Sequence, residues 1–171
     1  MQIRDAVEAD LPAIVEIYNA AIPNRLATAD LEPVSLESRL AWFHSHSDRY
    51  PVWVITSMQT SEEQIIGWLS FQMFYGRPAY QRTVEVSIYT APSHQRCGVG
   101  KQLLAHAIAQ SPKLQISNLV GMIFGHNIPS LRLFSSFGFQ QWGLLPQIAD
   151  LDRIERDLII MGLRISSPQI R

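Results

Sequence analysis

Hydrophobic and polar positions alternate most regularly over residues 83–89. The even-numbered positions carry Val, Val and Ile, and the odd-numbered positions carry Thr, Glu, Ser and Tyr. A period of two predicts a half-buried β-strand whose open side presents the carboxylate of Glu85. We expect the strand to end at Ala91-Pro92, because proline cannot donate a hydrogen bond to a β-ladder.

A helical pattern follows within ten residues. Apolar residues recur at Val99, Leu103, Leu104, Ala107 and Ile108, the spacing of one face of a helix. Ser-Pro at 111–112 stops this helix. A strand therefore runs into a glycine-containing loop, and that loop opens the helix.

The same signals predict the other elements. They are a strand over 2–4, a helix capped by Asp10, a loop over 21–34, a helix capped by Ser35 and broken by Pro51, strands over 52–57 and 65–74 around a polar turn at 59–64, a strand over 119–124, a short helix capped by Ser130 and closed by Gly138, and strands over 139–145 and 157–164 around a long loop. This order suits a mixed sheet with helices on its faces. We expect one domain over residues 1–165 and a mobile tail over 166–171.

Composition narrows the class of protein. The 171 residues suit one domain with a proper core, and 47% hydrophobic with 17% charged residues is an ordinary globular balance. A net charge of −1 gives no reason to expect nucleic acid or an anionic membrane as a partner. One cysteine excludes an internal disulfide, and the histidines lack ligand spacing, so we predict no metal. The first residues do not resemble a signal peptide, and a cytoplasmic protein is expected.

The loop before the 99–110 helix has the chemistry of an anion site. The first turn of a helix carries unpaired N–H groups and partial positive charge. Gly98 and Gly100 let a phosphate approach the backbone, and Arg96 and Lys101 add charge. The alternative is that both glycines only form a turn. Neither the Walker pattern nor G-x-G-x-x-G is present.

Gln95-Arg96-Cys97-Gly98-Val99-Gly100 resembles the Q/R-x-x-G-x-G/A pyrophosphate loop of the GCN5-related N-acetyltransferase (GNAT) superfamily. Other segments resemble its phosphinothricin acetyltransferase-like branch, in the same order along the chain. They are Ile17-Tyr18-Asn19, Asp48-Arg49-Tyr50-Pro51, Arg77-Pro78-Ala79-Tyr80, Glu85 before Ser87-Ile88-Tyr89, Asn127 with Ser130-Leu131-Arg132-Leu133, and Phe137-Gly138-Phe139. The resemblance implies the GNAT fold, an α/β fold with a mixed, mostly antiparallel sheet of six to seven strands, helices on both faces, and a splay between the fourth and fifth strands that holds acetyl-CoA.

The resemblance also implies which residues bind the coenzyme. Backbone groups of Ile88, Tyr89 and Thr90 would hold the pantetheine arm and polarise the thioester, and Asn127 would touch the pantetheine with Ser130 nearby. For Asn127 and Ser130 the alternative is turn and helix-cap chemistry. The full expected coenzyme set is Ile88, Tyr89, Thr90, Gln95, Arg96, Cys97, Gly98, Val99, Gly100, Lys101, Asn127, Ser130 and Phe134.

Glu85 is the expected general base. An ammonium acceptor must lose a proton before it attacks a thioester, and partial burial would raise the pKa of Glu85 toward a useful value. The family's base matches the same position within the strand. The alternative is a solvent-facing or salt-bridged glutamate on an edge strand.

A general acid is harder to assign. Related enzymes often carry Tyr or His where this chain has Phe134, which has no proton to give. Either the thiolate leaves unaided, or a tyrosine such as Tyr75, Tyr80 or Tyr89 contributes.

The expected acceptor-binding residues are Tyr75, Arg77, Tyr80, Thr83 and Glu85. Arg77 can pair with a carboxylate or a phosphinate, or it forms a surface salt bridge instead. Two aromatic positions of the branch are replaced here, around Ala29 and around Glu155. A small amine or an amino acid analogue is therefore a safer prediction than phosphinothricin itself.

Three functions follow from these residues. The first is acetyl-CoA-dependent N-acetylation of a small molecule, by direct transfer, in a protein expected from the resemblance to be a homodimer. The second is an acyl-CoA-binding sensor or partner module without turnover, and the third is acetylation of a protein N-terminus. A pocket closed by the Arg77 segment and the 145–156 segment would favour a small acceptor.

Overall fold

The computed structural model describes residues 1–59 and 62–165, so the expected mobile tail lies outside the described residues. Its strands and helices are β1 (Gln2–Asp5), α1 (Leu11–Ala21), α2 (Leu36–His44), β2 (Val52–Gln59), β3 (Glu62–Met73), β4 (Thr83–Thr90), α3 (Val99–Gln110), β5 (Asn118–Phe124), α4 (Ile128–Ser136), β6 (Gln140–Leu151) and β7 (Ile154–Arg164). Short 3-10 turns lie at Glu8–Asp10, Pro78–Tyr80 and Pro92–His94.

All seven strands form one sheet in the order β1-β2-β3-β4-β5-β7-β6. Every pairing is antiparallel except that of β4 with β5, which is parallel. The parallel pair needs a crossover, and α3 supplies it. The mixed, mostly antiparallel sheet expected from the sequence is confirmed.

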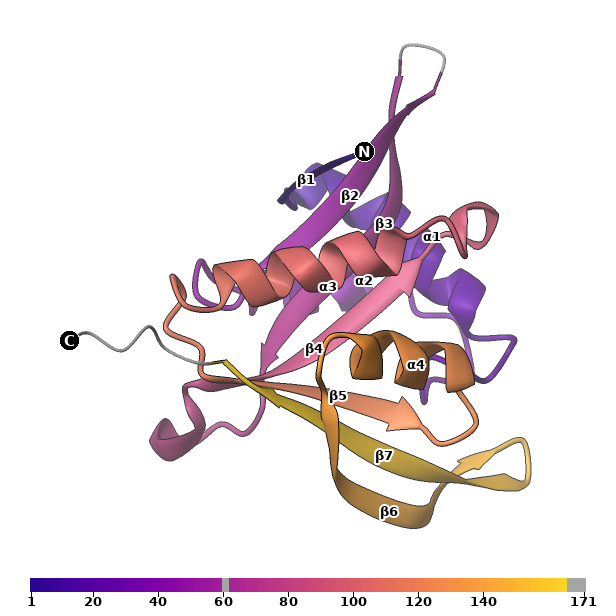
Figure 1. Cartoon of the computed structure of the whole chain (residues 1–171). Coiled ribbons are helices and arrows are strands. Elements are labelled where there is room, and N and C mark those ends of the chain that lie inside the picture. Colours follow the sequence, from indigo (N-terminus) through magenta and orange to yellow (C-terminus); the bar gives the residue numbers. More distant parts are fainter. Residues whose placement is uncertain (60–61, 166–171) are drawn as a thin grey trace, which may run out of the picture.

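The parallel pair is short. Thr83, Val84 and Glu85 pair with residues 118–120 of β5, and the pairing stops there. Beyond Glu85 the two strands diverge, as Figure 1 shows. The expected splay between the fourth and fifth strands is therefore present, and it begins at the predicted base.

Helices cover both faces of the sheet (Figure 1). Leu103 and Leu104 of α3 pack on the face that carries Phe71, Val84 and Val86. On the other face Ile14 and Tyr18 of α1 pack against Val54 and Trp68. The alternation read from residues 83–89 is confirmed, since Val84 and Val86 are buried and Glu85 faces the α1 side.

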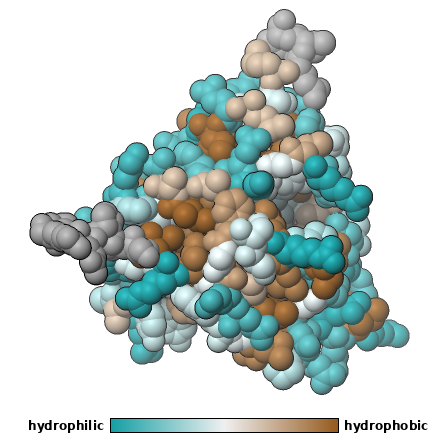
Figure 2. Space-filling model, in the orientation of Figure 1, coloured by the Kyte–Doolittle hydropathy of each residue, from teal (hydrophilic) through white to brown (hydrophobic). Residues whose placement is uncertain are grey.

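The outer surface on the α3 and α4 side is mixed. Figure 2 shows hydrophobic residues interspersed with hydrophilic ones over this face.

Of the two predicted helix caps, that of α2 is confirmed and that of α4 is wrong. Ser35 caps α2 as expected, since its hydroxyl accepts a hydrogen bond from the Ser38 N–H at 3.1 Å. Ser130 does not cap α4. Asn127 does, and it accepts from the Ser130 N–H at 3.2 Å. Asparagine caps as well as serine does, and Pro129 suits the first turn of a helix that begins at residue 128.

Several predicted boundaries are wrong. No long loop joins the last two strands, because β6 continues to Leu151 and a turn at Asp152 and Arg153 leads straight into β7. Both turn residues have positive φ, 55° and 68°, as a tight hairpin turn requires. The polar turn at 59–64 is also too long, since β2 and β3 extend to residues 59 and 62. In addition, α2 ends at His44, well before Pro51.

Asp10 precedes α1, but its carboxylate does not act as the predicted cap. Its carboxylate pairs with Arg4 at 2.6 Å and accepts from the Val7 N–H at 2.8 Å. No side-chain cap bond joins Asp10 to α1. The residue therefore ties β1 to the start of α1.

Gly67 of β3 allows the first turn of α3 to lie against the sheet. A Cβ atom at this position would lie 2.7 Å from Cγ1 of Val99 and 3.0 Å from the carbonyl oxygen of Tyr89. Both neighbours lead into the predicted coenzyme site, so the close approach fixes the loop before α3 relative to β4.

We predict that Gly67→Ala lowers the free energy of unfolding by about 1–3 kcal/mol, because overpacking forces the sheet and α3 apart. Urea denaturation measures it. Gly76→Ala is the control, since a Cβ there meets nothing within 4 Å. Equal stability of the two variants would contradict the prediction.

Candidate active site

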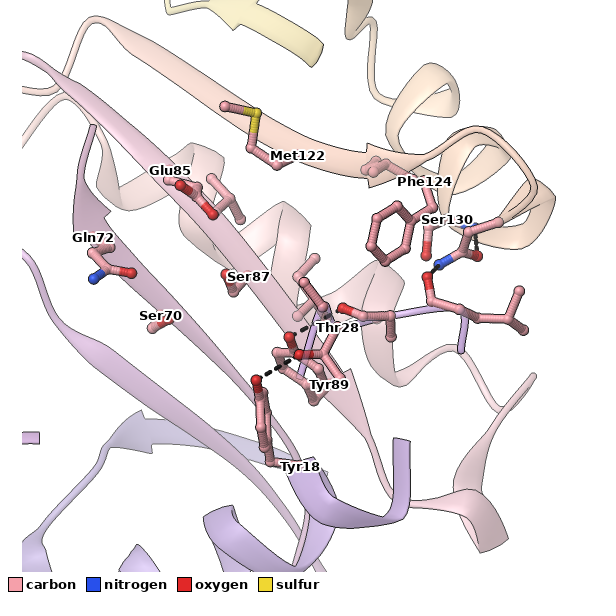
Figure 3. Close-up of a pocket in the computed structure, with 18 of the residues that line it drawn as sticks. Tyr18, Thr28, Ser70, Gln72, Glu85, Ser87, Tyr89, Met122, Phe124 and Ser130 are labelled. Carbon is pink, nitrogen blue, oxygen red and sulfur yellow. Dashed lines mark hydrogen bonds between the residues drawn. The ribbon is translucent and has the colours of Figure 1, made fainter. Parts of the chain in front are cut away.

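A cavity of about 510 Å³ occupies the splay. Its walls are β3, β4 and β5, together with α1, α2, the 22–34 segment, the start of α3, α4 and parts of β6 and β7. Figure 3 shows Gln72, Ser70, Glu85 and Ser87 projecting from β3 and β4 toward this space, opposite Met122 of β5. The predicted coenzyme and base residues that line it are Glu85, Ile88, Tyr89, Thr90, Gly100, Asn127, Ser130 and Phe134.

The predicted pyrophosphate loop lies where β4 gives way to α3. Arg96 and Gly98 both have positive φ, 61° and 81°, which turns the chain sharply before the helix. The first hydrogen bond of α3 runs from the Gln102 N–H to the Gly98 carbonyl at 3.0 Å. The N–H groups ahead of it therefore form a helix N-terminus suited to an anion.

The members of this loop differ in what they can offer a ligand. Cys97 is exposed, whereas Val99 is buried in the core. Val99 can thus contribute only its backbone. Gln95, Arg96, Cys97, Gly98, Val99 and Lys101 do not line the cavity in the splay.

The edge of β4 beyond Glu85 has the form of a ligand site. Ile88, Tyr89 and Thr90 line the cavity and pair with β3, but β5 has already diverged. Their backbone groups on the β5 side are free for a ligand with amide groups of its own. This edge fits the pantetheine arm of acetyl-CoA, whose two amides can bond like an added strand.

Glu85 is half-buried inside the cavity, opposite Gln72 in the β3–β4 register. Burial raises the pKa of its carboxyl, since desolvation disfavours the charged form. No salt bridge of the described chain involves Glu85, and β4 lies in the middle of the sheet. The salt bridge and the edge strand of the alternative are therefore absent from the described structure, whereas Glu85 keeps some exposure to solvent.

Two tyrosines fasten the 22–34 segment over the cavity. The Tyr89 hydroxyl donates to the Ala27 carbonyl at 3.1 Å, and its ring stacks on Trp68 at 4.6 Å. The Tyr18 hydroxyl donates to Asp30 and lies 2.6 Å from the Thr28 hydroxyl. Burial raises the pKa of both tyrosines.

Asn127 is a structural residue that also lines the cavity. Its Nδ2 donates to the Leu26 carbonyl at 2.9 Å while its Oδ1 caps α4. The cap named as the alternative is present, and the contact of Asn127 with the pantetheine stays a prediction. Phe134 packs against Phe139 at 4.8 Å and against Gly121, where a Cβ would lie 2.6 Å from the ring.

The predicted acceptor residues other than Glu85 do not line this cavity. The Tyr75 and Tyr80 rings pack together at 5.6 Å, and Arg77 lies 5.6 Å from the Tyr75 ring. Thr83 accepts a hydrogen bond from Asn118 at 3.1 Å. The structure thus gathers Tyr75, Arg77 and Tyr80 in the segment between β3 and β4, beside the cavity wall rather than in it.

Sequence reasoning missed several lining residues. Ser70 and Gln72 alternate with Leu69 and Phe71, a signal that was visible within the predicted strand. Their place opposite Ser87 and Glu85 depends on the β3–β4 register, which the pattern alone does not give. The others come from α1, α2, β5 and the 22–34 segment, and they include Tyr18, Thr28, Arg39, Trp42, Met122 and Phe124.

Comparison with known proteins decides the family. A model of the acetyltransferase (GNAT) family matches residues 11–139. The chain belongs to this family. It is an acetyl-CoA-dependent N-acyltransferase, with acetyl-CoA as its co-substrate.

Three relatives of this GNAT protein cover nearly its whole length. YwnH of Bacillus subtilis (strain 168), whose name assigns it provisionally to phosphinothricin acetylation, is 45% identical over 97% of this chain and 100% of its own. The L-methionine sulfoximine/L-methionine sulfone acetyltransferase of Salmonella typhimurium is 34% identical over 96% and 95%. The crystal structure of a phosphinothricin acetyltransferase from Sinorhizobium meliloti with acetyl-CoA has a TM-score of 0.90 and 28% identity, covering 99% and 91%.

The remaining expectations concern location and metals. Over the described residues, no helix of this GNAT protein has the length and apolar character needed to cross a membrane. The same residues contain no group of three or more His, Cys, Asp or Glu placed to hold a metal. A cytoplasmic location and the absence of a metal stay predictions.

We predict that Glu85→Gln raises the free energy of unfolding more at pH 8 than at pH 4. In the unfolded chain the pKa of the Glu85 carboxyl is about 4.3. Because the folded pKa is higher, the folded wild type holds a proton that the unfolded chain has lost, and its stability falls as pH rises through that window. The amide removes this loss. Chemical denaturation at both pH values measures it, with Glu155→Gln on the exposed hairpin as the control. An equal effect at both values would refute the prediction.

Proposed function

We propose that the protein transfers the acetyl group of acetyl-CoA to the amine of a small amino acid or amino acid analogue of the sulfone, sulfoximine or phosphinate type. The observation that carries the proposal is the cavity in the splay. It places a half-buried carboxylate beside a strand edge suited to the pantetheine arm. The names of the relatives supply the acceptor class.

Glu85 acts as the general base in this proposal. It takes the proton from the acceptor ammonium, directly or through a water molecule, and its raised pKa makes the carboxylate a better base. The free amine attacks the thioester carbon, the C–S bond breaks as the new C–N bond forms, and the nitrogen releases its second proton to solvent. Backbone N–H groups near Ile88, Tyr89 and Thr90 stabilise the negative charge on the carbonyl oxygen.

The thiolate leaves without a side-chain acid. Phe134 has no proton, and the Tyr89 hydroxyl is committed to the Ala27 carbonyl. Tyr75 and Tyr80 lie outside the lining. A thiol with a pKa of about 8.5 is a good leaving group, so the thiolate can leave first and take its proton from solvent.

The walls of the cavity favour a small-molecule acceptor over a protein N-terminus. Ala29 of the 22–34 segment and Ile148 and Ala149 of β6 wall the cavity on the acceptor side. The Tyr75, Arg77 and Tyr80 cluster forms a nearby edge at which Arg77 can receive an α-carboxylate. The sensor alternative gives no reason to keep an unpaired carboxylate in the cavity.

We also propose a homodimer formed through the β6–β7 hairpin. β6 is an edge strand, and apolar side chains are exposed along the hairpin at Trp142, Leu144, Ile148 and Ile154. Leu144 is the expected contact, whereas Met161 of β7 belongs to the core.

The decisive test is a thiol-release assay over amines and over amino acid sulfones, sulfoximines and phosphinates. We predict turnover with at least one amino acid analogue, and a fall of about 10²-fold in kcat for Glu85→Gln with an unchanged dissociation constant for acetyl-CoA. Calorimetry measures the binding. Glu85 is not the base if the variant stays within a few-fold of wild type at neutral pH. Tight acetyl-CoA binding without turnover of any acceptor would support the sensor.

We predict that Leu144→Glu shifts the protein from dimer to monomer, because a charge in an apolar contact is costly to desolvate. Sedimentation velocity measures the mass. Met58→Glu, an equally drastic change at an exposed position of β2, should leave the dimer intact. A monomeric wild type, or a dimeric Leu144→Glu variant, would overturn the proposed interface.

A further inference from the structure

The cavity in the splay has two charged side chains in its described lining, Glu85 and Arg39. Glu85 comes from β4 and Arg39 from α2. The negative charge serves the acceptor amine in the proposed function, and that function gives the positive charge no role.

Arg39 is held firmly in place. Its guanidinium carbon lies 4.2 Å from the centroid of the Tyr18 ring and 5.3 Å from that of Trp42. Nη2 donates to Asp30 at 3.4 Å, and the side chain is 19% exposed. An arginine fixed by two rings loses little conformational entropy when it binds a ligand.

The guanidinium keeps donors for a ligand. It carries five N–H groups, and within the described chain Asp30 is its one hydrogen-bond acceptor. Asp30 is itself held by the Tyr18 hydroxyl. The remaining N–H groups form a fork suited to two oxygens on one atom.

The positions of the two charges set the length of the acceptor. Along the sheet face the cross-strand pairs run from Glu85 and Gln72, through Ser87 and Ser70, to Tyr89 and Trp68. Tyr18, which carries Arg39 on its ring, packs on Tyr89 at 4.9 Å. Glu85 and Tyr89 are four residues apart, about 13 Å along the strand.

An α-carboxylate lies only about 3 Å from its own amine, whereas an oxygen at the end of a methionine-length side chain lies about 6 Å away. The longer distance therefore covers more of the separation between Glu85 and Arg39 than the shorter one does. Ser70 and Ser87 lie along the path between Glu85 and Tyr18 (Figure 3).

We propose that Arg39 binds the distal oxygen group of the acceptor, the S=O or P–O oxygens at the end of its side chain, while Glu85 engages the amine. This inference rests on the proposed function. It leaves the α-carboxylate to the edge that contains Arg77. Arg39 is thus a specificity residue for oxidised or phosphinate side chains.

The test uses methionine sulfone and methionine, which differ only in the two distal oxygens. The value of kcat/KM is measured for both acceptors with wild type, Arg39→Met, Arg39→Lys and Arg77→Met. We expect wild type to prefer the sulfone, and Arg39→Met to lower that preference by about 10- to 100-fold, the usual effect of losing charge-assisted hydrogen bonds. Arg39→Lys should keep part of the preference, because it retains the charge without the fork.

Arg77→Met is the matched control. It should lower kcat/KM for both acceptors alike, because both carry the α-carboxylate. The dissociation constant of acetyl-CoA and the thermal midpoint show whether each variant is folded. If Arg39→Met does not fold, the preference for the sulfone is compared between wild type and Arg39→Lys instead.

The possible outcomes separate the two proposals. The inference is overturned if Arg39→Met lowers kcat/KM equally for both acceptors, because that result would place the α-carboxylate at Arg39. It is also overturned if Arg39→Met leaves the preference for the sulfone unchanged, or if it weakens acetyl-CoA binding instead. A wild type that turns over both acceptors without preference overturns the inference and leaves the proposed function standing. If wild type turns over no acceptor, both the inference and the proposed function are overturned.

Discussion

The site depends on where the pairing of β4 with β5 stops. Three residues of each strand pair, and the next residue of β4 after Glu85 has no partner on β5. Buried backbone groups without partners are costly, so the divergence persists only where a ligand or water can satisfy them. The same break opens the cavity and exposes the strand edge that fits the pantetheine arm. One interruption of the ladder thus sets the positions of the proposed base and of the proposed coenzyme-binding edge together.

The outer walls of the cavity are held by polar contacts between distant segments. Tyr89 binds the Ala27 carbonyl and Asn127 binds the Leu26 carbonyl. Arg25 pairs with Asp152 in the β6–β7 turn at 2.7 Å. These contacts join the 22–34 segment to β4, to the start of α4 and to the last hairpin. The segment is therefore fixed by side chains where it has no regular structure of its own.

Sequence alone predicts the local part of this arrangement. The alternation at 83–89 gives the strand and the orientation of Glu85, and the glycine loop before Val99 marks the start of α3. Register is not local, so Gln72 opposite Glu85 could not be found. Arg39 was missed for the same reason, since it reaches the cavity only through the packing of α2 against α1 and Trp68. In the 145–156 segment, Pro146 and several polar residues obscure a strand that is paired on one side only, so the sequence pattern predicts a loop there.

Glu85 shows why a position proposed for catalysis can look unfavourable as a structural one. A half-buried carboxylate without an ion pair makes the folded state less stable at neutral pH than a neutral side chain would. An ion pair would remove that cost, but it would also lower the pKa and weaken the base. The cavity keeps the other charge, Arg39, on α2 and already engaged with Asp30. Separation of the two charges along the sheet face therefore preserves the basicity of Glu85, and it leaves between them the space that the proposed acceptor needs.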